Sequence, residues 1–258
     1  MLIDFFGELG RRNRSLFWFG WLNVGLLFLA LVMMMIDQTT IMGINAWIKP
    51  MKFAISITIY SWTFGWMLYY SQSTLANRLI TLGLIVTMLV EIVLIYLQAF
   101  RGTTSHFNIH SAFDGIVFGV MGIFIGINTL VNFCTILLFF SSKVTVERSA
   151  LWAWRCGLVL FFLGSLSGGW MVSQLAHTVG AMDGGPGLPL VNWSTTAGDI
   201  RAAHFITLHG LQAIPLAAWI LRDHPTGVRW SMVFTIGYAA LCIYLHLIAF
   251  LGIPVIRL

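Results

Sequence analysis

Seven long apolar runs decide what this chain can fold into. The runs cover residues 15–36, 53–70, 79–100, 115–140, 151–177, 200–221 and 230–251. Each has roughly the length, about 20 residues, that an α-helix needs to cross a lipid bilayer. Because lipid offers the backbone no hydrogen-bond partner, such runs must form helices, and they are too long for the alternating strands of a β-barrel. We therefore predict an all-α integral membrane protein, in which residues 1–258 form a single bundle of seven transmembrane helices.

The composition agrees with a membrane protein and restricts its partners. Hydrophobic residues make up 59% of the chain, charged residues make up 9%, and the mean hydropathy is +0.88, which excludes a water-soluble globule. The lipid bilayer is therefore the first expected partner. The net charge of +5 is spread over the loops without a long basic run, so we expect no nucleic-acid partner.

The distribution of lysine and arginine predicts how the chain is oriented. Nine of these residues lie at the N-terminus, in the loops after the second, fourth and sixth runs, or just inside the fifth run, and five lie on the opposite side. The nine are Arg11, Arg12, Arg14, Arg78, Lys143, Arg148, Arg155, Arg222 and Arg229. Because cytoplasmic loops carry the excess of positive charge, we predict a multi-pass protein of the cell membrane with a cytoplasmic N-terminus and an extracytoplasmic C-terminus.

The histidines gather on one predicted side of the membrane. Of the seven, only His224 falls on the cytoplasmic side. The others lie in the outer half of the membrane or in an outer loop, and they are His106, His110, His177, His204, His209 and His246. Several imidazoles from different helices suit a metal ion such as zinc, iron or copper, or haem b, which takes two facing histidines. These six histidines are the predicted metal ligands.

Polar residues of the sixth run share one helical face. At about 100° per residue, an arc of about 140° contains Arg201, His204, His209 and Gln212. A face of this kind is costly against lipid, so we expect it to point into the bundle.

Glu91 is the only acid deep within an apolar run. An intramembrane carboxylate predicts a functional site, through proton uptake, metal ligation or an ion pair with Arg201. Glu91 and Arg201 are therefore the predicted catalytic residues. The structural alternative is a protonated Glu91 that is hydrogen-bonded between helices.

The residues before the fourth run allow two interpretations. His106, His110 and Asp114 have an H-x3-H-x3-D spacing, which would put all three on one face of a helix, as a metal site often requires. Ser111 and Asp114 also form an S-x-x-D pattern, which is typical of a helix cap and leaves both histidines in the loop. We favour the cap. Asp199, directly before the sixth run, is likewise expected to be an N-cap.

Two lysines lie beside the second run on its predicted outer side. The segment NAWIKPMKF places Lys49 and Lys52 next to Trp47 at interface depth, with Pro50 suited to a first helical turn. Snorkelling of both lysines toward lipid headgroups is the expected role. The alternative is a site for an anionic small molecule or lipid that arrives from the outer side.

Small residues recur at helical spacing in two runs. Gly164 and Gly168 form a small-xxx-small pair in the fifth run. One face of the fourth run carries Gly115, Gly119, Gly122 and Gly126. We expect both patterns to let another helix backbone approach closely.

Three stretches, NAWIKPMKFAISITIY, LQAFRGTTSHFN and GDIRAAHFITLHGLQAIPL, resemble a family of multi-pass bacterial membrane proteins. The resemblance touches most of the chain, implies a bacterial inner-membrane protein, and carries no activity with it. Rhodopsins share the helix count, but the seventh run here has no lysine to form a retinal Schiff base. The seven-helix zinc hydrolases, which include alkaline ceramidases and progestin receptors, have an H-x3-H pair in the last span, whereas the pair in this chain lies between the third and fourth runs.

These features are compatible with two functions of different classes. The first is a metal or haem site near the outer face that serves a membrane redox or hydrolytic enzyme. The second is a proton-coupled transporter or sensor, in which Glu91 and the histidines titrate without a metal. A structural or partner-binding role is the third possibility.

Reporter fusions test the predicted orientation. Fusions after Ser142 and Pro225 should report the cytoplasm, and fusions after Gly185 and Leu258 should report the outside, because the nine basic residues hold their loops in the cytoplasm. The reverse pattern would move the six histidines to the cytoplasmic half and contradict an outward-facing site.

Overall fold

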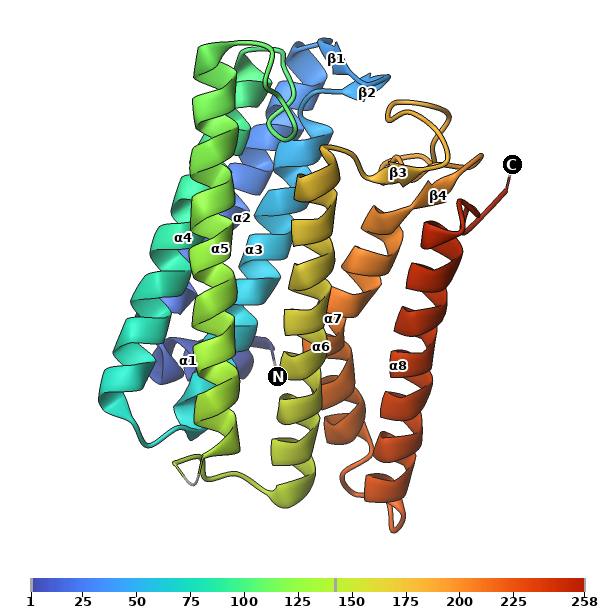
Figure 1. Cartoon of the computed structure of the whole chain (residues 1–258). Helices are drawn as coiled ribbons and strands as arrows, with labels where there is room; N and C mark the ends of the chain where they lie inside the picture. The colour runs from blue at the N-terminus through green and yellow to red at the C-terminus, as the bar shows by residue number, and fades with distance from the viewer. Residues whose placement is uncertain (1, 142, 258) are drawn as a thin grey trace. The chain divides into compact units, whose positions relative to one another are not determined.

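The computed structural model describes residues 2–141 and 143–257, and the described chain is almost entirely helical (Figure 1). The helices are α1 (Leu2–Arg12), α2 (Arg14–Ile36), α3 (Ile48–Met67), a 3-10 turn η1 (Leu68–Tyr70), α4 (Thr74–Phe100), α5 (Ala112–Phe140), α6 (Arg148–Gln174), α7 (Ile200–Ile220) and α8 (Gly227–Phe250). The chain divides within α5 into two compact units, of which unit 1 covers residues 1–134 and unit 2 covers residues 135–258. The all-α prediction is confirmed, and the single seven-helix domain stays a prediction. Two of the proposed fusion points, Ser142 and Leu258, lie outside the described residues.

Five helices of the described chain are long and apolar enough to cross a membrane, namely α2, α4, α5, α6 and α8. The remaining two predicted spans correspond to α3, with 20 residues, and α7, with 21 residues. Both are long enough to span, so their apolar character is what falls short. In α3 the average is lowered by Lys49, Lys52 and several hydroxyl side chains, and in α7 by the polar face that begins at Arg201.

The first helix, α1, was not expected from the sequence. Its 11 residues are amphipathic, so a search for apolar runs of spanning length passes over it. The helix packs on the end of α3, where the Phe5 and Trp66 rings stack with centroids 5.1 Å apart. The Arg12 guanidinium lies 3.9 Å from the centroid of the Trp66 ring and also bonds Glu8 at 2.8 Å. Asn13 then ends α1 and caps α2 by accepting a hydrogen bond from the Leu16 amide.

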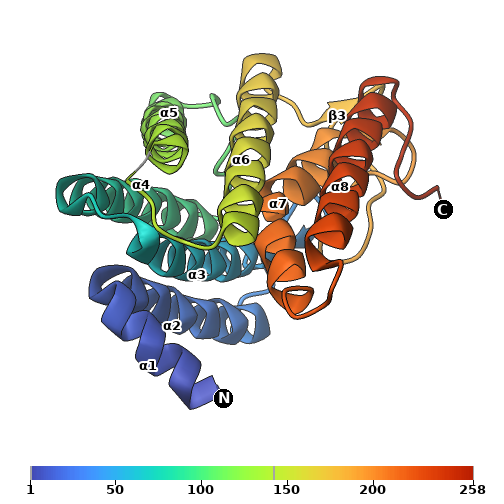
Figure 2. The same cartoon turned by 90° about the horizontal axis from the view of Figure 1, so that it is seen from below.

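In unit 1, α2 packs on α3 and α3 packs on α4, with α5 completing the unit (Figures 1 and 2). The α2 and α3 backbones approach closely because Gly20 leaves room for Trp62, whose indole N–H donates to the Phe17 carbonyl at 3.2 Å. A short hairpin of β1 (Thr40–Ile41) and β2 (Ile44–Asn45) joins α2 to α3. Pro50 lies in the first turn of α3, as predicted. We call the end of unit 1 where the α4–α5 loop lies the His106 end.

In unit 2, α7 lies between α6 and α8 (Figure 2). The predicted small-residue contact is confirmed in α6, because a side chain at Gly164 would come within 3.1 Å of the Leu208 backbone nitrogen of α7. A Cβ at Gly168 would come equally close to the His204 ring. The loop between α6 and α7 is closed at its base by β3 (Thr178–Val179) and β4 (Gly198–Asp199), a strand pair that the glycine-rich sequence concealed. Within unit 1, no described atom approaches the Cβ positions of the four α5 glycines within 4 Å, so the second predicted contact is not seen there.

The α6–α7 contact predicts a difference between two glycines of the same helix. Gly164→Val should lower the free energy of unfolding by about 1–3 kcal/mol more than Gly169→Val, because only the first side chain would meet the α7 backbone. Thermal unfolding in detergent measures both variants. Equal losses would show that the change in helix propensity, and not the contact, is responsible.

Candidate functional site

Glu91 is a carboxylate buried in α4. The residue is only 1% exposed, and neither carboxylate oxygen has a hydrogen-bond partner among the described residues. The His106 imidazole lies nearby. Its Nε2 is 3.4 Å from Glu91 Oε1, but the two groups are not aligned for a hydrogen bond. The predicted interior position of Glu91 is therefore confirmed within unit 1. A carboxylate in such surroundings needs a positive charge, a donor or a proton of its own.

His106 connects Glu91 to a lysine of α3. The Lys49 Nζ lies 3.1 Å from His106 Nδ1, on the side of the ring opposite to Glu91. An ammonium group can only donate, so it makes Nδ1 an acceptor and leaves the ring proton on Nε2. Nε2, which carries that proton, lies 3.4 Å from Glu91 Oε1 but is not aligned for a hydrogen bond. Lys49, His106 and Glu91 thus form a line of donors and acceptors, which we call the Glu91 relay.

The imidazole of the Glu91 relay lies between aromatic rings. The His106 side chain is 25% exposed, and the rings of Phe53, Phe107 and Phe118 have centroids 5.9, 6.2 and 6.5 Å from it. Burial, followed by the positive charge of Lys49, lowers the pKa of His106 well below its usual value. The ring is therefore neutral at physiological pH, with one donor and one acceptor nitrogen. Phe107, with φ at +58°, has the left-handed backbone that bulky residues rarely adopt, which places a strained residue directly beside the relay.

The rim of the His106 end is held by Asp114, in the first turn of α5. Its amide bonds Ser111 Oγ at 3.1 Å, which confirms the predicted capping interaction. Its carboxylate accepts from Gln98 at 2.9 Å and from Arg101 at 2.5 Å, so α4 and α5 are joined here. His106 and His110 both precede the helix, and the idea that they form one helical face with Asp114 is wrong. His110 is exposed at the surface of the loop.

One turn below Glu91 lies a buried polar group that sequence reasoning missed. It is formed by Tyr60 of α3, Thr87 of α4, and Asn128 and Asn132 of α5, and we call it the Tyr60 cluster. The Tyr60 hydroxyl lies 3.2 Å from both asparagine Oδ1 atoms, and Asn132 Nδ2 donates to Tyr60 at 3.0 Å. The single Thr87 hydroxyl hydrogen has two acceptors, the Gly83 carbonyl of its own helix at 2.7 Å and Asn128 Oδ1 at 3.2 Å. The four residues are at most 7% exposed. The N-x3-N spacing of Asn128 and Asn132, which puts two amides on one helical face, was the signal available in the sequence.

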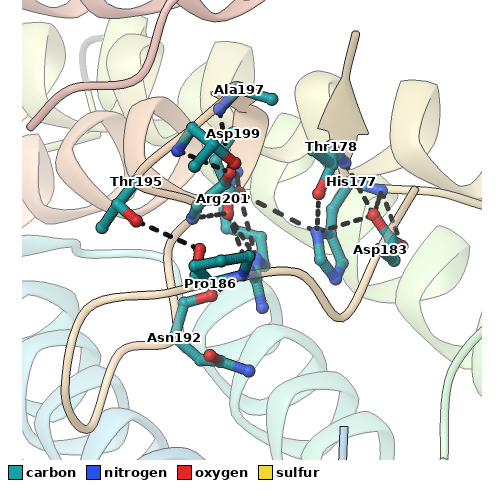
Figure 3. A network of polar contacts seen from close by, with 11 residues as sticks. His177, Thr178, Asp183, Pro186, Asn192, Thr195, Ala197, Asp199 and Arg201 are labelled. Atoms are coloured by element: carbon teal, nitrogen blue, oxygen red, sulfur yellow. Dashed lines mark hydrogen bonds and ion pairs between the residues drawn. The ribbon is translucent and has the colours of Figure 1, made fainter. Parts of the chain in front are cut away.

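In unit 2, Arg201 and His177 converge on Asp199 (Figure 3). We call Asp199, Arg201, His177, Asp183 and the Ser194 amide the Asp199 network. The Arg201 guanidinium bonds Asp199 Oδ2 at 2.6 Å, and the Ser194 amide donates to the same oxygen at 2.9 Å. His177 Nδ1 lies 3.1 Å from Asp183 and 3.9 Å from Asp199. Asp199 also accepts from the Arg201 amide, which confirms its predicted role as the N-cap of α7. Arg201, suggested by the sequence as a partner of Glu91, is thus held by Asp199.

The remaining histidines lie on α7 and α8. His204 Nδ1 donates to the Gly164 carbonyl of α6 at 2.8 Å, since a carbonyl can only accept. His246 Nδ1 similarly donates to the Cys242 carbonyl at 2.8 Å. His209 stacks on Phe205 with centroids 4.2 Å apart. His204 is close enough to His246 and His209 for their charges to interact, so these three predicted residues share a region of unit 2.

A multi-ligand metal site does not fit these positions. Within residues 2–141 and 143–257, no group of three or more His, Cys, Asp or Glu side chains is arranged to hold a metal ion. The six histidines predicted as ligands are distributed over the Glu91 relay, an exposed loop position, the Asp199 network and the α7–α8 region. Within neither unit do the described residues bring three of these histidines into a metal-binding arrangement.

Comparison of the chain with protein-family models, with curated proteins and with solved structures found no match. The function is therefore inferred from the chemistry of the chain's own residues.

The Asp199 network predicts a structural role. Asp199→Ala should lower the free energy of unfolding by about 2–3 kcal/mol and expose the 180–198 loop to protease, because Arg201 and the Ser194 amide lose their buried acceptor. Asp223→Ala is the control, since that side chain is 86% exposed beside Arg222. Thermal unfolding and limited proteolysis provide the measurement, and similar behaviour of the two variants would contradict the assignment.

Proposed function

We propose that this membrane protein binds protons reversibly at Glu91, as part of a proton-coupled transporter or a proton sensor. The observation that carries the proposal is a buried carboxylate with no hydrogen-bond partner among the described residues, which faces a neutral imidazole held by a lysine. The positive-inside rule favours an extracytoplasmic His106 end, so Glu91 would be reached from outside the cell. We further propose that α3 and α7 cross the membrane with the five apolar helices, because the short connections before and after them fit a seven-span topology.

The Glu91 relay supports a proton-transfer step whose atoms balance. The Lys49 ammonium gives a proton to His106 Nδ1 while His106 Nε2 gives its own proton to the Glu91 carboxylate. Lys49 then recovers a proton from water, and the partly exposed ring returns to its first tautomer by giving its Nδ1 proton to water and taking one from water at Nε2. The net result is one proton moved from water to Glu91. A neutral imidazole is suited to this role because it accepts at one nitrogen and donates at the other.

A carboxylate that gains or loses a proton in a dry interior also changes the energy of its surroundings. The charged form requires the Lys49 charge and the His106 donor, whereas the neutral form does not. Proton binding at Glu91 would therefore alter how strongly α4 is held to α3 and to the α4–α5 loop. This coupling is what a proton-driven transporter or a proton sensor requires.

A metal or haem remains a second candidate on one observation. His204 and His246 both direct Nδ1 to a backbone carbonyl, which orients Nε2 as the basic nitrogen, as in many ligating histidines. Metal analysis and an absorption spectrum of the purified protein test this candidate. A bound ion or haem that is lost in both His204→Ala and His246→Ala would support it, and its absence after expression with both available would exclude it.

Infrared difference spectroscopy tests proton binding directly. A pH change should produce a carboxylic acid C=O band in the wild-type protein in lipid, and Glu91→Gln should remove that band while the protein still folds, because the amide keeps the shape and cannot titrate. Glu147→Gln, at an exposed position, is the matched control and should keep the band. A band unchanged by Glu91→Gln would refute the proposal.

The relay itself predicts a kinetic difference between two histidines. After a rapid pH change, His106→Gln should slow the appearance of the Glu91 band about tenfold or more, because the group that passes the proton is missing. His110→Gln, in the same loop but exposed, should leave the rate unchanged. Lys49→Met and Lys52→Met form a second matched pair with the same expected contrast. Equal rates within both pairs would show that protons reach Glu91 by another route.

A further inference from the structure

Below Glu91, the interior of unit 1 contains a second set of groups able to handle protons. The α4 residues Glu91 and Thr87 are one helical turn apart, about 6 Å along the axis. Thr87 Oγ1 belongs to the Tyr60 cluster through its hydrogen bond to Asn128. The carboxylate and the cluster are therefore successive polar levels in one helix bundle, with Glu91 nearer the His106 end.

The Tyr60 cluster has the chemistry of a relay and extends away from Glu91. The Thr87 and Tyr60 hydroxyls can each accept one proton and donate another, so a proton can pass with no net change in either group. The Tyr60 hydroxyl has two acceptors at 3.2 Å, on Asn128 and Asn132, and can turn between them. Asn132 is one further turn along α5 from Asn128, in the direction away from the His106 end.

A third polar level lies closer to the opposite end of unit 1. Thr81 is six residues before Thr87 in α4, about 9 Å further along the axis and about 120° around it. Its hydroxyl accepts a hydrogen bond from Asn13 Nδ2 at 2.9 Å, at the junction of α1 and α2. Gly83 brings α5 close to α4 at this depth, because a side chain there would meet Val131.

We infer that unit 1 is a transmembrane proton path, in which the Tyr60 cluster gives Glu91 a second exit toward the end of the membrane opposite His106. This inference rests on the proposed proton binding at Glu91, and it makes the protein a proton carrier rather than a sensor open to one side. In each cycle, a proton enters through His106, resides on Glu91, and leaves through the Thr87 and Tyr60 hydroxyls. Both hydroxyls face Asn128 Oδ1, which can only accept, so water passes the proton between them as well as between levels. Each hydroxyl accepts one proton on the Glu91 side and gives up another on the opposite side, so it is neutral again after every transfer.

A purely structural cluster would behave differently. Hydrogen bonds between membrane helices stabilise a bundle by about 0.6–2 kcal/mol each, so their loss alone lowers stability without affecting proton movement. Tyr96 provides the comparison, since it is 6% exposed in the same unit and its hydroxyl donates to the Leu26 carbonyl at 2.6 Å. Tyr60→Phe and Tyr96→Phe each remove one buried tyrosine hydroxyl, but only the first interrupts the proposed path.

Proton flux into liposomes tests the path. The full-length protein is reconstituted with a trapped pH-sensitive dye, and a potassium gradient with valinomycin supplies the driving force. The wild-type protein should acidify the interior faster than empty liposomes, and Glu91→Gln should abolish this flux. Tyr60→Phe should reduce it about tenfold, as expected for a missing proton-transfer group, whereas Tyr96→Phe should not. Thr87→Val, which keeps the side-chain shape, provides a second variant if Tyr60→Phe fails to fold.

The outcomes separate this inference from the proposed function. If the infrared band of Glu91 titrates but the wild-type protein conducts no more than empty liposomes, Glu91 binds protons from one side and the path is refuted. Flux that is equally high in Tyr60→Phe, Thr87→Val and Tyr96→Phe would also overturn the path and leave the cluster a structural role. If Glu91 neither titrates nor supports flux, both the proposed proton-binding site and the proposed path are refuted.

Discussion

The absence of water inside a bilayer governs how this protein places its polar side chains. A hydroxyl or amide in hydrocarbon must find its partner within the chain, because no solvent replaces a missing hydrogen bond. The Thr58 hydroxyl donates a hydrogen bond to the Ala54 carbonyl of its own helix, whereas the Tyr60 hydroxyl bonds asparagine side chains of α5. His204 makes the same kind of contact in unit 2 by bonding the Gly164 carbonyl. The bonds between helices, such as those of Tyr60 and His204, help to select which helix faces meet.

Glu91 and Asp199 show how the same constraint separates the proposed proton-binding carboxylate from a structural one. Both side chains are 1% exposed. Asp199 accepts from Arg201, from the Ser194 amide and from the first turn of α7, so its charge is satisfied permanently. Among the described residues, Glu91 has only a misaligned imidazole at 3.4 Å. A carboxylate kept in that condition can exist with or without a proton, and this property is what makes it suitable for proton transfer.

The predicted histidine ligands have different partners within their own units. Six histidines share one predicted side of the membrane, but side is a property of depth and says little about distance within the plane. His106 joins Glu91, His177 joins the Asp199 network, and His204 lies against α6. Lys49, interpreted from its position beside Trp47 as a snorkelling residue, instead approaches the His106 ring. The partners of these side chains within each unit are set by helix packing, which the sequence pattern does not reveal.

The sequence by itself determined the class of the protein and the positions of its long helices. Apolar runs ending at Ile36, Phe100 and Phe140 end where α2, α4 and α5 end, because hydrophobic length and turn-forming neighbours are local properties. Asp199 was recognisable as a cap for the same reason. The amphipathic α1 was not recognised because it is not an apolar run of spanning length. The Tyr60 cluster was not recognised because only the spacing of Asn128 and Asn132 marks it locally, and its other two members come from α3 and α4. Only the tertiary structure decided that Lys49, His106 and Glu91 lie in line, because their side chains come from α3, a loop and α4, and the packing of those elements sets the distances between them.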